Sequence, residues 1–140
     1  MNSIDTILKY IHESNDFVVT SHVNPDGDNI GSTLSIYYFL KKVNKNVYYV
    51  MNDEMPINMQ FLVKDINSQK FKELNIKNYN LVALDCGDKN RICVDDDIRD
   101  NCIKLINIDH HGSNDFYGDL NYVLAEESST CELVYNLLMR

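Results

Sequence analysis

The segment FVVTSHVNPDGD, residues 17–28, joins an apolar run to a turn rich in polar side chains. The apolar run predicts a buried strand over residues 16–20. Pro25 and Gly27 predict a loop over residues 24–29, in which Gly27 is expected to take a backbone conformation closed to other residues. The strand would deliver three side chains to one place, namely His22, Asp26 and Asp28. Taken alone, the turn is either a metal site or ordinary turn chemistry.

Two further polar clusters follow apolar runs in the same way. Asp85 comes directly after the run LVAL, and a triplet of acidic and imidazole side chains ends another run. These runs predict strands over residues 80–84 and 103–108, and a similar run predicts one over residues 47–51. The triplet is Asp109, His110 and His111. Asp85 alone could be a strand-end contact with solvent, so its role depends on the other clusters.

The other periodic segments predict helices. Apolar residues at i, i+3, i+4 and i+7 favour an amphipathic helix over residues 3–13, with Ser3 as its N-cap. Further helices are expected over residues 31–42, 57–63, 66–74 and 130–139. Ser129 would cap the last helix, and Glu132 would complete a capping box.

Strands alternate with helices along the chain. This alternation predicts an α/β fold with a mostly parallel sheet flanked by helices. The chain of 140 residues is expected to form one domain, residues 1–140. In such sheets ligands bind beyond the carboxyl ends of the strands, where all three polar clusters would lie. The clusters are therefore expected to form one site.

The composition restricts the class of function. A net charge of -8 argues against a protein that holds long double-stranded nucleic acid on a basic surface, but it is compatible with a small phosphorylated substrate. No apolar stretch is long enough for a membrane span and no secretory signal is visible, so we expect a cytoplasmic protein without a membrane partner. The four cysteines show no zinc pattern and are expected to act as small hydrophobic residues.

The three clusters combine carboxylates with imidazoles, which favours manganese or a similar divalent ion over metals that prefer thiolates. A set this rich in carboxylates can hold two ions, an arrangement common in the hydrolysis of phosphate esters. Of His110 and His111, one is expected on metal and the other on substrate. For Arg91 we favour a local pair with Asp88 that shapes the loop over a direct catalytic role.

Three polar segments have competing interpretations. Residues 95–97, three aspartates, predict a solvated acidic turn. Residues 128–130, Ser-Ser-Thr, predict a helix cap, with a phosphate contact as the alternative. The first N–H groups of the helix expected at residues 31–42 could also help to hold phosphate.

The motifs resemble those of the DHH phosphoesterase superfamily. The resemblance rests on residues 21–28, 84–88 and 108–111 and extends through residues 31–32, 116–121 and 128–132. Motif order and spacing agree, and the match is best with the bacterial branch of oligoribonucleases (nanoRNases) and 3'-phosphoadenosine-5'-phosphate phosphatases. The resemblance implies a metal-dependent hydrolase that acts on very short RNA or on a 3'-phosphorylated nucleotide.

The resemblance also implies roles for individual residues. His22 and Asp26 would bind one manganese ion. Asp28 and His110 would bind a second ion, and Asp85 would bridge the two. The catalytic set would be Asp85, Asp109 and His111, with Asp109 orienting the histidines from outside the ligand set. The expected substrate contacts are His111, Gly31, Ser32 and Arg91.

Two departures from the family limit these expectations. Members of this branch carry a fourth motif with another metal-binding aspartate, and a C-terminal DHH-associated domain, and residues 1–140 contain neither. We therefore expect a truncated catalytic domain with a weak second metal site, and self-association as one way to cover apolar surface. The alternatives are a manganese inorganic pyrophosphatase, a cyclic dinucleotide phosphodiesterase, a RecJ-type exonuclease or, in another class, an inactive metal- or nucleotide-binding fragment.

Overall fold

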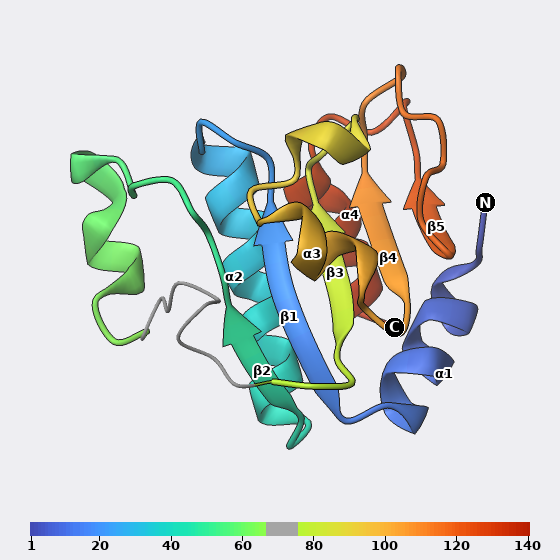
Figure 1. Ribbon diagram of the computed structural model, residues 1–140. Helices are drawn as coiled ribbons and strands as arrows, with labels where there is room; N and C mark the ends of the chain where they lie inside the picture. The colour runs from blue at the N-terminus through green and yellow to red at the C-terminus, as the bar shows by residue number, and fades with distance from the viewer. Residues whose placement is uncertain (67–75) are drawn as a thin grey trace.

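The computed structural model describes residues 1–66 and 76–140. Its strands are β1 (Asp16–Ser21), β2 (Asn46–Tyr49), β3 (Asn80–Leu84), β4 (Leu105–Asp109) and β5 (Leu120–Val123). They form one five-stranded sheet in the order β2-β1-β3-β4-β5, and each neighbouring pair is parallel (Figure 1). The predicted α/β fold with a parallel sheet is confirmed.

The register of the central strands determines where the polar clusters lie. Ser21 at the end of β1 lies opposite Leu84 at the end of β3, and Leu84 lies opposite Ile108 of β4. Because parallel strands end at the same edge of a sheet, the residues that follow these three positions meet there. Those residues are His22, Asp85 and the triplet Asp109, His110 and His111.

Helices cover both faces of this sheet (Figure 1). The α-helices are α1 (Ile4–Glu13), α2 (Gly27–Lys42), α3 (Asp96–Asp100) and α4 (Thr130–Leu138), and the short 3-10 helices are η1 (Ile57–Val63) and η3 (Lys89–Arg91). Alternate strand residues enter two separate core clusters: Val82 packs with α1, α2 and α4, whereas Leu81 packs with Ile98 of α3. Every residue of β3 and β4 is buried, as expected for strands that are covered on both faces.

Helix α2 begins earlier than the sequence predicted. Its first residue is Gly27 rather than residue 31, so the loop expected over residues 24–29 is limited to residues 24–26. Gly27 has no positive φ, so the special conformation expected for it is wrong. The left-handed residue of this turn is Asn24, with a φ of 57°. Asp26 is the N-cap and accepts from the backbone N–H groups of Asp28 and Asn29, which is why the helix can start here. Those N–H groups are therefore not free for phosphate.

Three short elements were not predicted, namely β5, α3 and the 3-10 helix η3. β5 has four residues and contains a buried asparagine, so its apolar signal is weak; it pairs with β4 along the sheet edge. α3 occupies part of the expected acidic turn, because Asp96 and Asp97 fall in its first turn, where carboxylates complement the helix dipole.

The remaining expectations for helix ends are met in part. Ser3 caps α1 and Ser129 caps α4, as predicted. Glu132 accepts from the backbone N–H and hydroxyl of Ser128, not from the N-cap residue, so the capping box is displaced by one residue. The helix expected over residues 57–63 is the 3-10 helix η1. The piece expected over residues 66–74 falls, apart from Ile66, outside the described residues.

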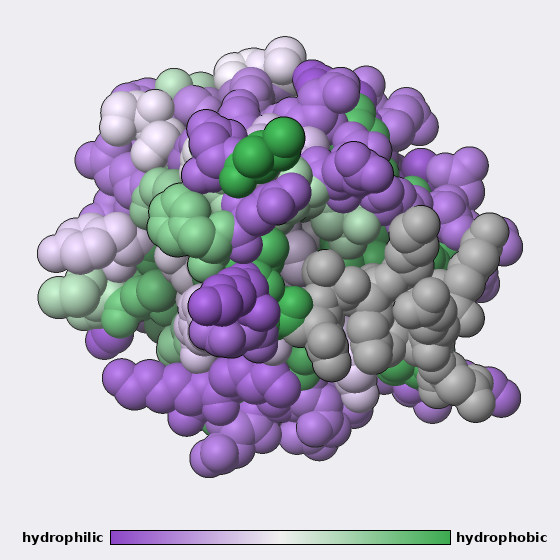
Figure 2. Space-filling view, turned by 90° about the vertical axis from the view of Figure 1, so that its left-hand side faces the viewer, coloured by the Kyte–Doolittle hydropathy of each residue, from purple (hydrophilic) through white to green (hydrophobic). Residues whose placement is uncertain are grey.

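The surface carries some exposed hydrophobic side chains, among them Ile57 and Phe61 of η1. On the face shown in Figure 2, hydrophobic areas lie between larger hydrophilic ones. Within residues 1–66 and 76–140, no helix is both long and apolar enough to cross a bilayer. All four cysteines are free thiols; Cys86 and Cys93 are buried, and Cys102 and Cys131 are half-buried.

Candidate metal centre

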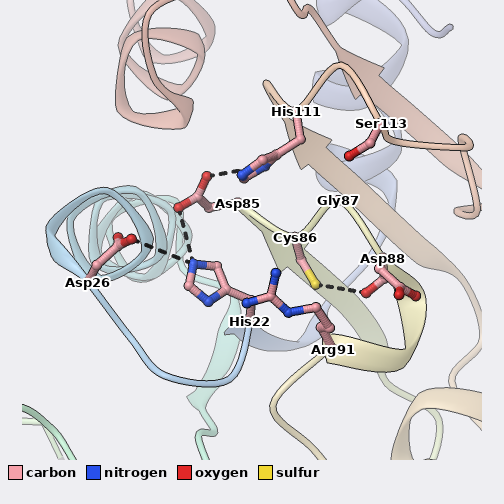
Figure 3. A pocket seen from close by; sticks show the side chains of 9 residues that line it. All are labelled: His22, Asp26, Asp85, Cys86, Gly87, Asp88, Arg91, His111 and Ser113. Carbon is pink, nitrogen blue, oxygen red and sulfur yellow. Dashed lines mark hydrogen bonds and ion pairs between the residues drawn. The ribbon is translucent and has the colours of Figure 1, made fainter.

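The carboxylate of Asp85 lies between two histidines at the carboxyl edge of the sheet. Its Oδ2 is 3.6 Å from Nε2 of His22, and its Oδ1 is 3.6 Å from Nε2 of His110. Figure 3 shows Asp85 between the His22 and His111 side chains, with Asp26 beside His22. Asp85 is only 2% exposed, so its two oxygens face the imidazoles rather than bulk water. One carboxylate is therefore shared between two groups of ligand atoms.

An outer carboxylate completes each group. Oδ2 of Asp26 is 3.9 Å from Nε2 of His22, and Oδ2 of Asp28 is 3.6 Å from Nε2 of His110. The five residues predicted as metal ligands are thus brought together in the predicted pairs. Ligand atoms of His22, Asp26 and Asp85 lie within 4.8 Å of one another, as do those of Asp85, His110 and His111.

Both inner histidines present the same ring nitrogen to the centre. Nδ1 of His22 is 2.6 Å from the carbonyl oxygen of Val23, and Nδ1 of His110 is 3.3 Å from that of Glu127. A carbonyl oxygen can only accept, so each Nδ1 carries the proton. In the neutral ring Nε2 then has the free lone pair, which is the tautomer that binds a metal.

The electrostatics of His22 fit a cation in this space. The pKa of His22 is raised above its ordinary value, first by the interaction with the Asp85 carboxylate. Burial acts in the opposite direction, and the Val23 carbonyl and the Asp26 charge add to the increase. The site therefore attracts positive charge at Nε2, which a proton or a metal ion can supply.

The backbone at Asp85 is unusual. Its φ is 53°, in the left-handed region that aspartate tolerates better than most residues. Its N–H donates to the carbonyl of Ile108, which continues the ladder between β3 and β4. The chain thus turns sharply straight after the strand. Residues held in this region cluster at functional sites.

Asp109 positions one histidine rather than both. It is fully buried, and its Oδ1 lies 2.7 Å from Nδ1 of His111. Its Oδ2 accepts from the side-chain amide of Asn114 at 2.7 Å. His110 is held instead by the Glu127 carbonyl. Because 43% of the His111 side chain is exposed, its ring can reach a bound molecule while Asp109 fixes its direction.

A cavity of about 220 Å³ opens beside this centre. It is lined by His22, Asp26, Asp85, Cys86, Gly87, Asp88, Arg91, His111 and Ser113 (Figure 3). The local pair expected between Asp88 and Arg91 is not among the ion pairs of the described residues. The Asp88 carboxylate instead accepts from the N–H of Asn90 and caps η3. Arg91 supplies the only lysine or arginine side chain among the residues that line this cavity.

Two expected substrate contacts lie away from the cavity. Ser32 is 0% exposed and donates its hydroxyl to the carbonyl of Asn29, so the prediction that it contacts substrate is wrong. A Cβ built on Gly31 would lie 3.0 Å from Sγ of Cys131. Gly31 therefore permits close packing of α2 against α4. The resemblance placed both residues near the site without showing that they face into the helix packing.

The first turn of α4 takes part in the centre, which sequence reasoning did not foresee. The N–H groups of Thr130 and Cys131 each donate to the Asp28 carboxylate at 2.8 Å, and the Thr130 hydroxyl donates to Oδ1 of Asp85 at 2.9 Å. The sequence signal for this role is the Ser-Ser-Thr segment, residues 128–130, which predicts a helix cap with a phosphate contact as the alternative. The N–H groups are instead engaged by a carboxylate of the chain itself.

These contacts change the acidity of Asp28. Burial by itself would raise its pKa, but the hydrogen bonds from Cys131 and Thr130 and the nearby His110 outweigh burial. The pKa of Asp28 therefore lies below its ordinary value, and the carboxylate is ionised at neutral pH. A charged oxygen ligand is thus available next to His110.

Comparison with known proteins gives three kinds of match. The family model described as "DHH family, N-terminal domain" matches residues 16–140. The chain is 35% identical to the bifunctional oligoribonuclease and PAP phosphatase NrnA of Thermus thermophilus over 86% of this chain and 35% of that protein. It is 25% identical to NrnA of Bacillus subtilis, over 95% of this chain and 41% of that protein.

A solved structure agrees with the fold. The crystal structure of an exopolyphosphatase-related protein from Bacteroides fragilis matches with a TM-score of 0.81 and 29% identity. The match covers 98% of this chain and 43% of the other chain. The present chain thus spans less than half the length of each of these relatives.

Proposed function

The chain belongs to the DHH family, and from this premise we propose that it is the metal-binding portion of a phosphoesterase. The proposed substrates are very short oligoribonucleotides and 3'-phosphoadenosine-5'-phosphate, and the proposed cofactor is a pair of manganese ions. The relatives named for these two activities match most of this chain, which supports the substrate class.

The observation that carries the proposal is the position of Asp85. Nε2 atoms of His22 and His110 approach opposite oxygens of its carboxylate, each at 3.6 Å. A single carboxylate with an imidazole on either side has the form of a bridging ligand between two ions. The donors are carboxylate oxygen and imidazole nitrogen, a set that suits manganese. We assign His22 and Asp26 to one ion, Asp28 and His110 to the other.

The side chains around these ligands have separate tasks. Divalent ions held here would supply Lewis-acid activation of water and neutralisation of phosphate charge. His111, directed by Asp109, is assigned to the scissile phosphate, to which its ring can donate a hydrogen bond. Arg91 at the cavity wall offers a cation to a phosphate oxygen. In a chain with a net charge of -8, the ions and Arg91 make the site locally favourable for an anion.

The experiment is hydrolysis of di- to pentaribonucleotides and of 3'-phosphoadenosine-5'-phosphate with and without manganese. We expect cleavage that requires manganese and is lost in Asp85→Asn. Inorganic pyrophosphate and a cyclic dinucleotide serve as comparison substrates for the other activities found in the superfamily. Folded protein that binds manganese yet cleaves none of the RNA or nucleotide substrates would contradict the proposed substrate class.

A further inference from the structure

We propose that Thr130 is a positioning residue for the bridging carboxylate, and that its hydroxyl sets the metal affinity of the centre. The inference rests on the proposed metal-dependent function and deepens it. It assigns to the first turn of α4 a role in metal binding in addition to its role in the fold.

The contact between Thr130 and Asp85 is direct and buried. The hydroxyl donates to Oδ1 of Asp85 at 2.9 Å, and Thr130 is 0% exposed. The torsion that turns a carboxylate about its Cβ–Cγ bond has broad minima, so packing alone fixes it weakly. A hydrogen bond to one oxygen selects one orientation. In that orientation Oδ1 faces His110 while Oδ2 faces His22.

Thr130 is distinct among the neighbours of this carboxylate. Within the described part of the chain it makes the one hydrogen bond to the Asp85 carboxylate, whereas the nearest histidine nitrogens lie 3.6–3.8 Å away. When the histidines direct Nε2 to metal ions, they no longer constrain Asp85 themselves. The hydroxyl still can, because a carboxylate oxygen has a second lone pair for a donor.

The same helical turn also fixes the outer ligand Asp28. Its two oxygens accept from the N–H groups of Thr130 and Cys131, at 2.8 Å each. The turn is itself anchored, since Ser129 caps α4 and Leu133 packs fully buried in the core. Two carboxylates from different elements, α2 and the end of β3, are therefore aligned by one rigid turn.

A buried hydroxyl of this kind could instead serve stability alone. The two roles differ in what they predict for metal binding. Loss of an outer-shell partner of a metal ligand typically costs ~10- to 100-fold in metal affinity. Loss of an ordinary buried hydrogen bond lowers thermal stability and leaves the affinity of the folded protein unchanged. The affinity for the metal alone, without substrate, therefore separates the roles.

The test is titration of wild type, Thr130→Val and Thr130→Ser with manganese chloride, followed by calorimetry or by the electron paramagnetic resonance of free manganese. Valine matches the shape of threonine and keeps the N–H that holds Asp28, but it cannot donate. We expect Thr130→Val to bind manganese ~10- to 100-fold more weakly. Thr130→Ser, which retains the hydroxyl, should restore wild-type affinity.

Thr33→Val is the matched control. Thr33 is equally buried, in α2, and its hydroxyl donates to the carbonyl of Asn29 rather than to a proposed ligand. Its manganese affinity should equal that of wild type. Thr130→Ala is the second variant if valine prevents folding, and the same loss is expected. Circular dichroism of the metal-free proteins establishes that each variant is folded.

Two outcomes would overturn the inference in distinguishable ways. If wild type binds manganese and folded Thr130→Val or Thr130→Ala binds it equally well, the hydroxyl has only a structural role, while the proposed function stands. The same conclusion follows if Thr33→Val loses as much affinity as Thr130→Val. If wild type itself binds no manganese, the proposed function fails, and the positioning role fails with it.

Discussion

The two halves of the candidate metal centre are built in different ways. His22 and Asp26 lie four residues apart on one continuous segment, and 64% of the Asp26 side chain is exposed. Asp28 and His110 come from α2 and from the end of β4, and only 22% of the Asp28 side chain is exposed. The first half depends on a local turn, whereas the second depends on the docking of α4.

The two halves are expected to respond differently to substitution. The Oδ1 atom of Asp26 already caps α2, and its other oxygen faces His22. Both oxygens of Asp28 are held by backbone N–H groups of another helix. A substitution in the first half that preserves the N-cap, such as asparagine in place of Asp26, should therefore affect the metal alone. Substitution in the second half should affect both the metal and the packing of α2 against α4.

The largest effect is expected from Asp85→Asn, which removes the charge shared by both halves. The affinity for manganese should fall by more than the ~10- to 100-fold that is typical when a hydrogen-bond partner of a metal ligand is removed. Asparagine tolerates the positive φ at this position, so the fold should survive. Calorimetric titration measures the loss. Wild-type affinity in this variant would refute the bridging role, and a thermal melt of the metal-free protein checks the fold.

Asp28→Asn is expected to have the next largest effect. An amide can accept from only one of the two N–H groups of α4, and its own NH2 group would face the other. The free energy of unfolding of the metal-free protein should fall by about 1–3 kcal/mol, the cost of leaving a buried donor without a partner. Urea denaturation measures this change. An unchanged midpoint would contradict the view that this carboxylate holds α4.

The pH dependence of that effect has a definite sign. Because the pKa of Asp28 in the folded state is lower than its ordinary value of 3.8, the charged carboxylate stabilises the fold at and above neutral pH. The stabilisation is complete above the unfolded pKa and is lost as the pH falls through the lower folded pKa. The stability difference between wild type and Asp28→Asn should thus shrink below about pH 4. A difference that grows towards acid would contradict this.

A smaller effect is expected from Asp26→Asn, the matched change in the local half. Asparagine is as good an N-cap as aspartate, so α2 should keep its start and the metal-free protein its stability. The loss of one charged ligand should weaken one manganese site and leave the other. Titration should resolve one weakened binding event beside one of wild-type strength. Equal destabilisation in Asp26→Asn and Asp28→Asn would remove the contrast between the halves.

Thr20→Val should have the smallest effect, because Thr20 belongs to neither half of the metal centre. The Thr20 hydroxyl is buried in β1 and has no hydrogen-bond partner among the residues that the structure describes. Valine removes this unsatisfied group with the same shape, so the change should be neutral or stabilise by up to about 1 kcal/mol. Metal affinity should not change. Thermal melts with and without manganese measure both, and a loss of stability would reveal a partner for this hydroxyl.

The sequence predicted the fold class and the proposed metal ligands because both depend on strong local patterns. Short apolar runs that end in His22, Asp85 and Asp109 specify strands and place polar groups at their carboxyl ends. Weaker patterns did not predict the elements that form there. β5 is short and contains Asn121, and α3 starts with aspartates that also suit a turn.

The missed and incorrect predictions for individual site residues have a different cause. Ser32 belongs to a motif that resembles the family's, but motif membership does not say which face of a helix a side chain occupies. Thr130 could be foreseen as part of a helix start, but not as a partner of Asp85, because 45 residues separate the two in the chain. Asn114 likewise contacts Asp109 only because the loop after β4 folds back.

The sequence alone determined the alternation of the main strands and helices, the polar residues that follow β1, β3 and β4, and hence the kind of chemistry available. Hydrophobic periodicity and turn residues act within a few positions, so they can be recognised in one dimension. The tertiary structure alone decided which oxygen of Asp85 faces which histidine, and that the first turn of α4 holds Asp28 and Asp85. Such contacts arise from strand register and helix docking, which bring together groups distant in the chain and fix their orientation.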